Sequence, residues 1–270
     1  MSSLPVLNIP MPCKCLWIGI SGGIDSIVLL HWAIKNRSQL GNNGIELRAV
    51  HVNHQISSNS QKWQQHVEMV CAKWDVSLSV QSVTVDIIGQ GLEQAARTAR
   101  YKVFDQLLGE GDVLALAHHQ EDQAETFLLR LLRGAGIHGL GAIPDNRPLG
   151  SANLWRPLLT IPKQLIIDYA KCNKLAWVED ESNRDIQYDR NFLRQKLLPL
   201  LRERWPQASK KIAQASEHAR EAQALLDEYA AHDLKNLNFI KWISIERRTS
   251  RLIVLEQLEV FPPHCFLCLK

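Results

Sequence analysis

A short loop at residues 21–26 combines glycines, hydroxyls and a carboxylate directly after an apolar run. Glycine lets a backbone approach a polyphosphate closely, and the first N–H groups of a helix favour an anion. Asp25 can hold a magnesium ion that bridges phosphates. The spacing of a Walker A motif is absent, and the alternative is a tight turn that binds nothing. The combination favours phosphate binding by Ser21, Gly22, Gly23, Ile24, Asp25 and Ser26.

A second group of polar residues lies at 117–126, where an apolar run is followed by helical spacing. Asp122 and Glu125 are three residues apart, so they share one helical face beside His118. No cysteine is near in the sequence, and hard oxygen donors favour magnesium and a ligand ammonium over a transition metal. We predict that Asp25 and Asp122 bind the metal. Asp122, Glu125 and His118 are all candidates to accept a proton.

Three charged residues recur at helical spacing in the segment 92–101. Glu93, Arg97 and Arg100 share one face and can point at one ligand. The structural alternative is an intrahelical pair between Glu93 and Arg97, worth about 0.2–0.5 kcal/mol, and the two interpretations are compatible. We predict a catalytic role for Arg97 and a nucleotide contact for Arg100. His51, at the end of an earlier apolar run, is expected to line the nucleotide pocket.

Positive charge is concentrated between residues 190 and 220, where there are eight Lys or Arg and two acidic residues, although the net charge of the chain is only +3. A basic stripe of this kind is what contact with a phosphate backbone requires. On charge alone, a solvated helix face is an equally weighted alternative. The residues expected to contact RNA are Arg190, Arg194, Arg202, Arg204, Lys210 and Lys211.

The pattern of apolar residues in the first half of the chain predicts a fold that can bring these polar groups together. Apolar runs at about 15–21, 47–52, 78–85 and 113–117 alternate with helical spacing at about 23–35, 60–74, 93–108 and 121–133. This alternation predicts an α/β fold, a doubly wound and mostly parallel sheet with helices on both faces. Such sheets bind ligands at the carboxyl ends of their strands near a topological switch point, and the polar groups lie at such ends.

The character of the chain changes after Pro144. We expect a loop at 144–153, a helix at 163–171 that begins after Pro162, and a polar, alanine-rich helix from about 206 to 232. A small helical C-terminal segment therefore follows the sheet. We place the boundary after residue 205, which divides the chain into regions 1–205 and 206–270.

The composition is that of an ordinary globular protein, with 46% hydrophobic and 22% charged residues. No run approaches the roughly 18 consecutive apolar residues of a membrane span, and no secretory signal is recognisable. The six cysteines are too scattered for a disulfide framework, so we expect a cytoplasmic protein with free thiols and no membrane partner. Cys265 and Cys268 are a weak indication of zinc, and we expect no site there.

The loop at 21–26 resembles the Ser-Gly-Gly-x-Asp-Ser signature of the N-type PP-loop ATP pyrophosphatases, which cleave ATP to AMP and pyrophosphate while activating a carbonyl oxygen. This resemblance implies an adenine nucleotide alpha hydrolase-like fold. Further segments between residues 15 and 205 resemble, in order, those of the tRNA(Ile)-lysidine synthetase family. They are 51–54, 92–101, 117–126, 133–140, 156–159, 177–183 and 188–194. Glu121 stands where that family usually has Asp, so we expect no direct ligand contact from it.

The resemblance implies ATP-dependent ligation of free L-lysine to C2 of the wobble cytidine of tRNA(Ile) with a CAU anticodon. The base is first adenylated, and the products are lysidine, AMP and pyrophosphate. ATP and Mg²⁺ are the implied cofactors. Residues 206–270 are then expected to be a helical linker and part of a truncated C-terminal tRNA-binding domain. Assembly as a homodimer is left open.

Two alternatives remain. A tRNA thiolation enzyme of the same superfamily would use paired cysteines to hold an iron–sulfur cluster or carry sulfur. Against this, Cys13 and Cys15 precede the loop, and Cys71 and Cys172 are single. A module that only binds nucleotide or tRNA would bind ATP without releasing pyrophosphate.

Overall fold

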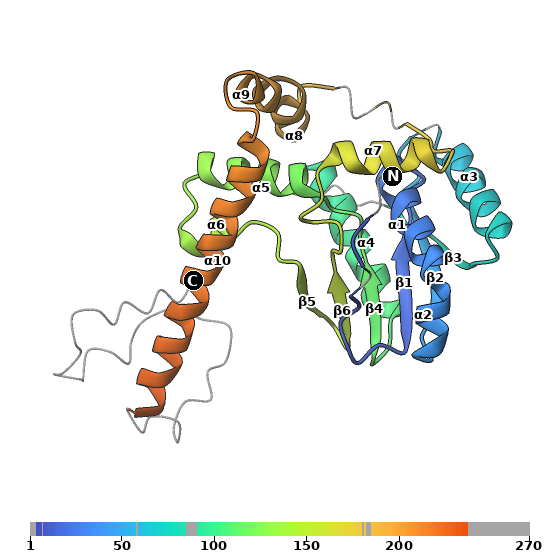
Figure 1. The fold of residues 1–270 in the computed structure, drawn as a ribbon, viewed down its shortest axis with the longest axis horizontal. Helices are drawn as coiled ribbons and strands as arrows, with labels where there is room; N and C mark the ends of the chain where they lie inside the picture. The colour runs from blue at the N-terminus through green and yellow to red at the C-terminus, as the bar shows by residue number, and fades with distance from the viewer. Residues whose placement is uncertain are drawn as a thin grey trace.

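The computed structural model describes residues 4–6, 8–57, 59–84, 91–179, 181 and 185–236, with residues 92, 93 and 234–236 described by their backbone alone. Six strands form one sheet in the order β3-β2-β1-β4-β6-β5 (Figure 1). Their bounds are Cys15–Gly19 (β1), Glu46–Asn53 (β2), Ser77–Ser82 (β3), Asp112–Ala115 (β4), Asn146–Leu149 (β5) and Ala152–Trp155 (β6). Every neighbouring pair is parallel except β5 with β6. The predicted doubly wound, mostly parallel sheet is confirmed.

Helices cover both faces of the sheet, which is why its strands are apolar on both sides. The helices concerned are α1 (Ile24–Lys35), α3 (Ser60–Lys73), α4 (Leu92–Leu107) and α7 (Lys163–Cys172). Along β1, Leu16 and Ile18 belong to the core shared with α1, α3 and α7. Cys15 and Trp17 belong to the opposite core, where Phe104 of α4 packs. Side chains alternate along a strand, so a run of consecutive apolar residues supplies both cores.

The arrangement around β1 creates a topological switch point. β2 and β3 lie on one side of β1, and β4 and β6 lie on the other. Because β1 and β4 are parallel neighbours, the segments that follow them emerge at the same edge of the sheet. The loop of residues 20–23 follows β1, and helix α5 (Gln120–Leu132) begins shortly after β4. The two polar groups predicted from the sequence therefore lie beside each other.

The structure differs from the expected elements mainly after residue 144. The expected loop at 144–153 contains the antiparallel hairpin of β5 and β6, with Gly150 at φ +56° in its turn. Pro148 lies on β5 at the edge of the sheet, where a missing N–H is tolerated. Two short helices, α2 (Arg37–Asn42) and α6 (Ile137–Leu140), are also absent from the expectation. Pro, Gly and Asn are typical of loops, and so short a hairpin has the same composition.

A helical arm follows α7 and returns to α5. It consists of α8 (Asp189–Phe192), the π-helical segment η2 (Leu193–Leu197), α9 (Leu198–Arg204) and α10 (Ala208–Asn236).

Helix α10 packs along α5 and α6 (Figure 1). The amide of Gln123 on α5 donates to Ser216 Oγ of α10 and to Ile143 O, both at 3.0 Å. Arg220 of α10 donates to Gly141 O at 2.7 Å. Buried hydrogen bonds therefore hold α10 against α5. Although α10 is 29 residues long, neither it nor any other helix in the described part of the chain is long and apolar enough to cross a membrane.

Candidate active site

The phosphate loop is held in shape by its own hydroxyl groups. Ser26, 5% exposed, donates to Gly23 O at 2.9 Å and accepts the N–H of Ser21 at 3.1 Å. Gly22 has φ +89°, and a Cβ there would lie 3.0 Å from Val178 Cγ2, so glycine is required. At Gly23 a Cβ would meet only Ser21 Oγ, at 3.5 Å. The loop therefore leaves space for an anion at the N-terminus of α1.

Asp25, in the first turn of α1, connects this loop to two other elements. Its carboxylate pairs with the ammonium of Lys163 at the start of α7. Its Oδ2 lies 3.9 Å from Nε2 of His119, the residue that precedes α5. The structure thus places Asp25 between the phosphate loop and the polar group predicted on α5.

His119 lies among three carboxylates. It is 4% exposed, its Nδ1 lies 3.3 Å from Glu121 Oε2, and its Nε2 lies 3.5 Å from Asp122 Oδ2. Burial lowers the pKa of this imidazole, but Asp122, Glu121 and Asp25 outweigh burial and raise the pKa of His119. The cluster therefore favours the protonated form of His119, which offsets part of its negative charge.

Glu121 caps helix α7. Its Oε2 accepts the backbone N–H of Lys163, the first residue of α7, at 2.9 Å. That N–H has no partner within its own helix, so a carboxylate is a favourable acceptor there. Burial raises the pKa of Glu121, but its bonds to His119 and Lys163 outweigh burial and hold that pKa below its usual range. The extra methylene relative to Asp extends the reach of this carboxylate toward α7.

Asp122 and Glu125 project from one face of α5, as helical spacing predicts, and Arg194 binds both. Arg194 Nε and Nη2 donate to the two oxygens of Glu125 at 2.7 and 2.8 Å. Its Nη2 also donates to Asp122 Oδ1 at 3.2 Å. Glu125 is 0% exposed and lies 3.4 Å from Arg190 Nε. Arg190 and Arg194, expected in an RNA-contacting stripe, are thus engaged with carboxylates of α5.

The two carboxylates respond differently to this environment. Burial raises the pKa of Glu125, although Arg194 opposes it. Burial acts in the same direction on Asp122, but the neighbouring His119 and His118 outweigh it and hold the pKa of Asp122 low. We refer to Asp25, Glu121, Asp122 and Glu125 as the acidic group.

Four arginines surround Tyr101 on α4. The guanidinium carbons of Arg97 and Arg147 lie 4.8 and 5.1 Å from its ring centre. Arg97 Nη2 donates to the phenolic oxygen of Tyr101 at 3.4 Å, and Arg156, which follows β6 and is 3% exposed, donates to Pro144 O. Burial raises the pKa of Tyr101, but the arginines, including Arg100, outweigh burial and lower it. We refer to Arg97, Arg100, Arg147 and Arg156 as the arginine cluster, and its charge suits an anion.

His118 lies beside the arginine cluster, on the other side from His119. The backbone at His119 is extended (φ −127°, ψ −178°), so consecutive side chains point in opposite directions. Burial lowers the pKa of His118 to about 3, and three of the four arginines add to this effect while Asp122 opposes it. An imidazole with so low a pKa is a weak proton acceptor near neutral pH. We therefore expect the imidazole of His118 to be neutral and to act as a hydrogen-bonding group.

His51, on β2, is hydrogen-bonded to the residue that enters the phosphate loop. It is 6% exposed, and its Nδ1 donates to Ile20 O at 2.8 Å. Burial lowers the pKa of His51, so the ring is neutral and Nδ1 carries the proton. The bond connects the end of β2 to the residue that enters the loop.

The fit of a magnesium ion depends on oxygen donors. Among the residues that the structure describes, no group of three or more His, Cys, Asp or Glu side chains is arranged to hold a metal ion. Magnesium, however, usually takes one or two carboxylates and completes its shell with phosphate oxygens and water. Asp25 and Asp122, which both lie beside His119, match that requirement.

The buried thiols lack the properties of sulfur carriers. Burial raises the pKa of Cys13 to about 11, of Cys15 to about 12 and of Cys71 to about 11. The thiolate is the form that binds metals and attacks sulfur, so these residues are inert near neutral pH.

Several predicted residues lie elsewhere. Arg204, Lys210 and Lys211 are exposed on α9 and the first turns of α10, and Arg202 is half-buried. Outside the described residues lie the side chain of Glu93, residues 180 and 182–184, and the cysteines at 265 and 268.

Sequence reasoning did not single out His119, Lys163, Tyr101, Arg147 or Arg156 as site residues. Tyr101 and Arg156 lie in segments that resemble the family, which is a signal that could have found them. Lys163 lies 138 residues from Asp25, and no local pattern indicates that pairing.

Comparison with known proteins identifies the family to which the chain belongs. Residues 4–201 match a family model described as a PP-loop domain. The chain is 46% identical over 230 residues to the tRNA(Ile)-lysidine synthase of Pseudomonas putida, a match covering 85% of this chain and 52% of that protein. It is 44% identical over 224 residues to the same-named protein of Legionella pneumophila strain Paris, covering 83% and 51% respectively. The chain thus spans about half the length of these curated relatives.

A solved structure supports the fold. The U34-tRNA thiolase NcsA from Methanococcus maripaludis matches with a TM-score of 0.65 and 17% identity, covering 78% of this chain and 72% of that one. At this identity the likeness concerns the fold alone.

Proposed function

This chain belongs to the PP-loop domain family, and from that premise we propose that it joins L-lysine to C2 of the wobble cytidine of tRNA(Ile) in an ATP-dependent reaction. In the first step, the C2 oxygen attacks the α-phosphate of ATP and pyrophosphate leaves. In the second, the lysine ε-amine attacks C2, the bond to AMP breaks, and a proton passes from the amine to a base. The names and identities of the relatives support this proposal.

The observation that carries the proposal is the meeting of three groups at one sheet edge. The phosphate loop follows β1, the acidic group is centred on the start of α5, and the arginine cluster surrounds Tyr101. The reaction brings together a polyphosphate, a cationic amino acid and an anionic leaving group. Each of the three groups has the charge or geometry that one of these species requires.

The phosphate loop would bind ATP. Backbone N–H groups of residues 21–24 and the N-terminus of α1 would contact the phosphates, while Ser26 keeps the loop in shape. Asp25 and Asp122 would hold Mg²⁺. When bound, the ion neutralises charge on the leaving pyrophosphate. Lys163 would then move away from Asp25 or turn toward the phosphates.

The acidic group would bind lysine. The ammonium of the lysine would share Asp122 with Arg194. The contact of Arg194 to Asp122, at 3.2 Å, is longer than both of its contacts to Glu125. Of the proton acceptors left open by the sequence, Glu125 is the best matched, because burial raises its pKa. His118, with a pKa of about 3, is poorly matched.

The arginine cluster would bind the adenylated base. Arg97 and Arg100 would contact the phosphate that joins AMP to C2, and this contact would also favour departure of AMP. The neutral His118 beside them can donate or accept one hydrogen bond to the base.

The basic residues of α9 and the first turns of α10 would contact the tRNA backbone. Arg202, Arg204, Lys210 and Lys211 lie on the arm that begins with Arg190 and Arg194. A cytoplasmic location, where tRNA, ATP and lysine are present, is part of this proposal. Assembly as a homodimer would be decided by sedimentation.

The test is incorporation of radiolabelled lysine into a transcript of the cytidine-wobble isoleucine tRNA, with ATP and Mg²⁺, while pyrophosphate release is followed in parallel. We expect lysine-dependent labelling of this tRNA and none of methionine tRNA. Pyrophosphate release without labelling would point to another acceptor. Binding without pyrophosphate release would replace the proposal with a binding module, and a brown, anaerobically purified protein would favour thiolation.

A further inference from the structure

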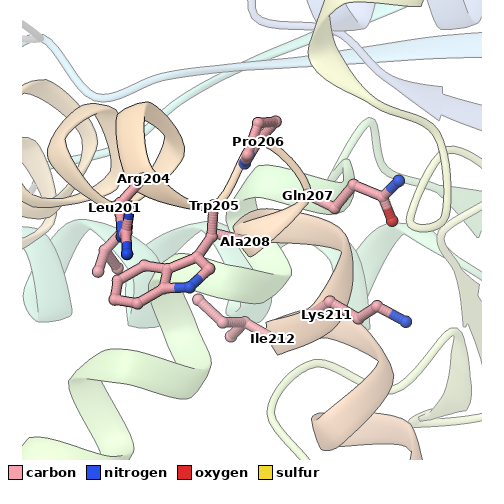
Figure 2. A pocket seen from close by; sticks show the side chains of 8 residues that line it. All are labelled: Leu201, Arg204, Trp205, Pro206, Gln207, Ala208, Lys211 and Ile212. Carbon is pink, nitrogen blue, oxygen red and sulfur yellow. The ribbon is translucent and has the colours of Figure 1, made fainter.

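An open groove lies where α9 meets α10, away from the phosphate loop. It encloses about 510 Å³ and its floor and walls include Leu201, Trp205, Pro206 and Ile212 (Figure 2). A hollow of this size can hold a small planar molecule. Nothing in the reaction proposed above uses it.

The side chain of Trp205 is the unusual feature of this groove. It is 61% exposed, although tryptophan is largely buried in most folded proteins. Figure 2 shows its indole ring beside Leu201 and Ile212. The ring thus lies next to apolar side chains, and much of its surface is left to solvent.

The backbone at Trp205 is fixed by hydrogen bonds on both sides. Its N–H donates to Leu201 O, and its carbonyl accepts the N–H of Ala208, both at 2.8 Å. The residue ends α9 in an extended conformation (φ −127°, ψ 90°), and the following Pro206 favours that conformation. The position from which the ring projects is therefore fixed at the junction of α9 and α10.

The rim of the groove is positively charged. Arg204 and Lys211 both line it, and both are exposed. Arg202 and Lys210 lie next to them in the sequence, with Glu203 as the acidic residue between the arginines. An exposed aromatic ring flanked by cations is the arrangement that binds single-stranded nucleic acid, since bases stack on the ring and phosphates meet the cations.

We propose that the groove binds an unpaired nucleobase of an RNA, stacked on Trp205, with Arg204 and Lys211 at the adjoining phosphates. The identity of that RNA as tRNA rests on the proposed function. The groove lies on the same helical arm as Arg194, which binds Glu125. Along this arm, Trp205 lies on the order of 15 Å from Arg194. An anticodon loop whose wobble base reaches the acidic group can therefore place another loop nucleotide at Trp205.

The experiment measures binding of the complete chain to an unmodified isoleucine tRNA transcript and to its isolated anticodon stem–loop, without ATP or lysine. Trp205→Ala is expected to weaken both affinities by about tenfold or more, because a base–aromatic stack is lost. Trp205→Phe keeps an aromatic face and should retain most of the affinity. Leu200→Ala, which removes an exposed residue of α9 that does not line the groove, is the matched control and should bind as the unaltered chain does.

The salt dependence separates stacking from charge. Lys211→Gln is expected to lower the slope of log affinity against log salt by about 0.7–0.9, whereas Trp205→Ala leaves the slope unchanged. Lys73→Gln, at the end of α3, is the charge-matched control and should leave the slope unchanged.

Unaltered RNA affinity of Trp205→Ala would overturn the proposal. If Trp205→Ala changed the sedimentation coefficient and left the RNA affinity unaltered, the proposal would also be overturned, and the occupant of the groove would be a protein. Because binding is measured without catalysis, Trp205-dependent binding by a chain that does not incorporate lysine would support the groove and reject the proposed reaction. Lysine incorporation together with RNA binding that does not depend on Trp205 would support the proposed reaction and reject the groove as an RNA site.

Discussion

His118 and His119 are consecutive residues whose pKa values shift in opposite directions. His119 lies among carboxylates that raise its pKa, whereas burial and the arginine cluster lower the pKa of His118 to about 3. Extended backbone between β4 and α5 turns the two rings to opposite sides. One peptide unit thus separates an imidazole that favours the protonated form from one that favours the neutral form.

The contrast shows how one site can handle reactants of opposite charge. Pooled in a single pocket, carboxylates and guanidinium groups would neutralise each other. The segment after β4 places His119 on the side of the carboxylates, while Arg190 and Arg194 reach the acidic group from the helical arm. Substitutions on each side should therefore have different consequences.

The largest effect is expected from Asp25→Asn on the acidic side. The neutral amide can neither pair with Lys163 nor serve as a strong magnesium ligand, so turnover should fall by about 10³-fold. Lysine incorporation at saturating ATP measures this, with Asp227→Asn on α10, an exposed acidic residue, as the matched control. Affinity for tRNA should change little. A comparable loss of tRNA affinity would contradict the assignment of Asp25 to the phosphates.

An intermediate effect is expected when each histidine is replaced by Asn and the free energy of unfolding is followed with pH. The folded-state pKa of His118 is depressed, so the unfolded chain binds more protons below about pH 6.5 and the contribution of His118 to stability falls as pH falls. The folded-state pKa of His119 is raised, so its contribution is complete below about pH 6.5 and is lost as pH rises through the folded-state value.

The two variants should therefore remove slopes of opposite sign, each of at most about 1.4 kcal/mol per pH unit. His118→Asn should flatten the acidic limb of the stability curve, and His119→Asn the limb above about pH 6.5. Urea unfolding across this range measures both slopes. Changes of the same sign in the two variants would mean that the histidines share one environment.

The smallest effect is expected from Arg147→Gln on the basic side. The cation–π contact with Tyr101 contributes about 0.5–1 kcal/mol, and removing it also relieves repulsion within the arginine cluster. Stability should thus change by less than about 1 kcal/mol, while AMP affinity should fall by about fivefold. Calorimetric titration with AMP measures this, with Arg37→Gln as a control distant from the cluster. Unchanged AMP affinity would place the phosphate elsewhere.

Local patterns predict the sheet well, because burial on two faces imposes apolar runs and one-sided helices impose a fixed spacing. The expected strand at 47–52 and helix at 60–74 agree with β2 and α3 to within one residue at each end. The same patterns place the phosphate loop and the face shared by Asp122 and Glu125. They do so because both features depend on neighbours close in the chain.

The rest depends on distant neighbours. Arg194 lies 69 residues from Glu125, and its pairing follows from how the arm folds back rather than from any local spacing. The choice between His118 and His119 required the direction of one stretch of extended backbone. Arg147 was hidden in a segment whose Pro, Gly and Asn content is typical of a loop, although it lies on β5.

Helix α10 has a mechanical consequence. Its 29 residues span about 43 Å, and its third and fourth turns are fastened through Ser216 to Gln123 of α5 and through Arg220 to Gly141 at the end of α6. The residues beyond Arg220 span about 24 Å, so a tilt of about 5° at α5 moves the far end of α10 by about 2 Å. The same leverage works in reverse. A load at the far end reaches α5 as a small rotation, delivered to the turn that carries Asp122.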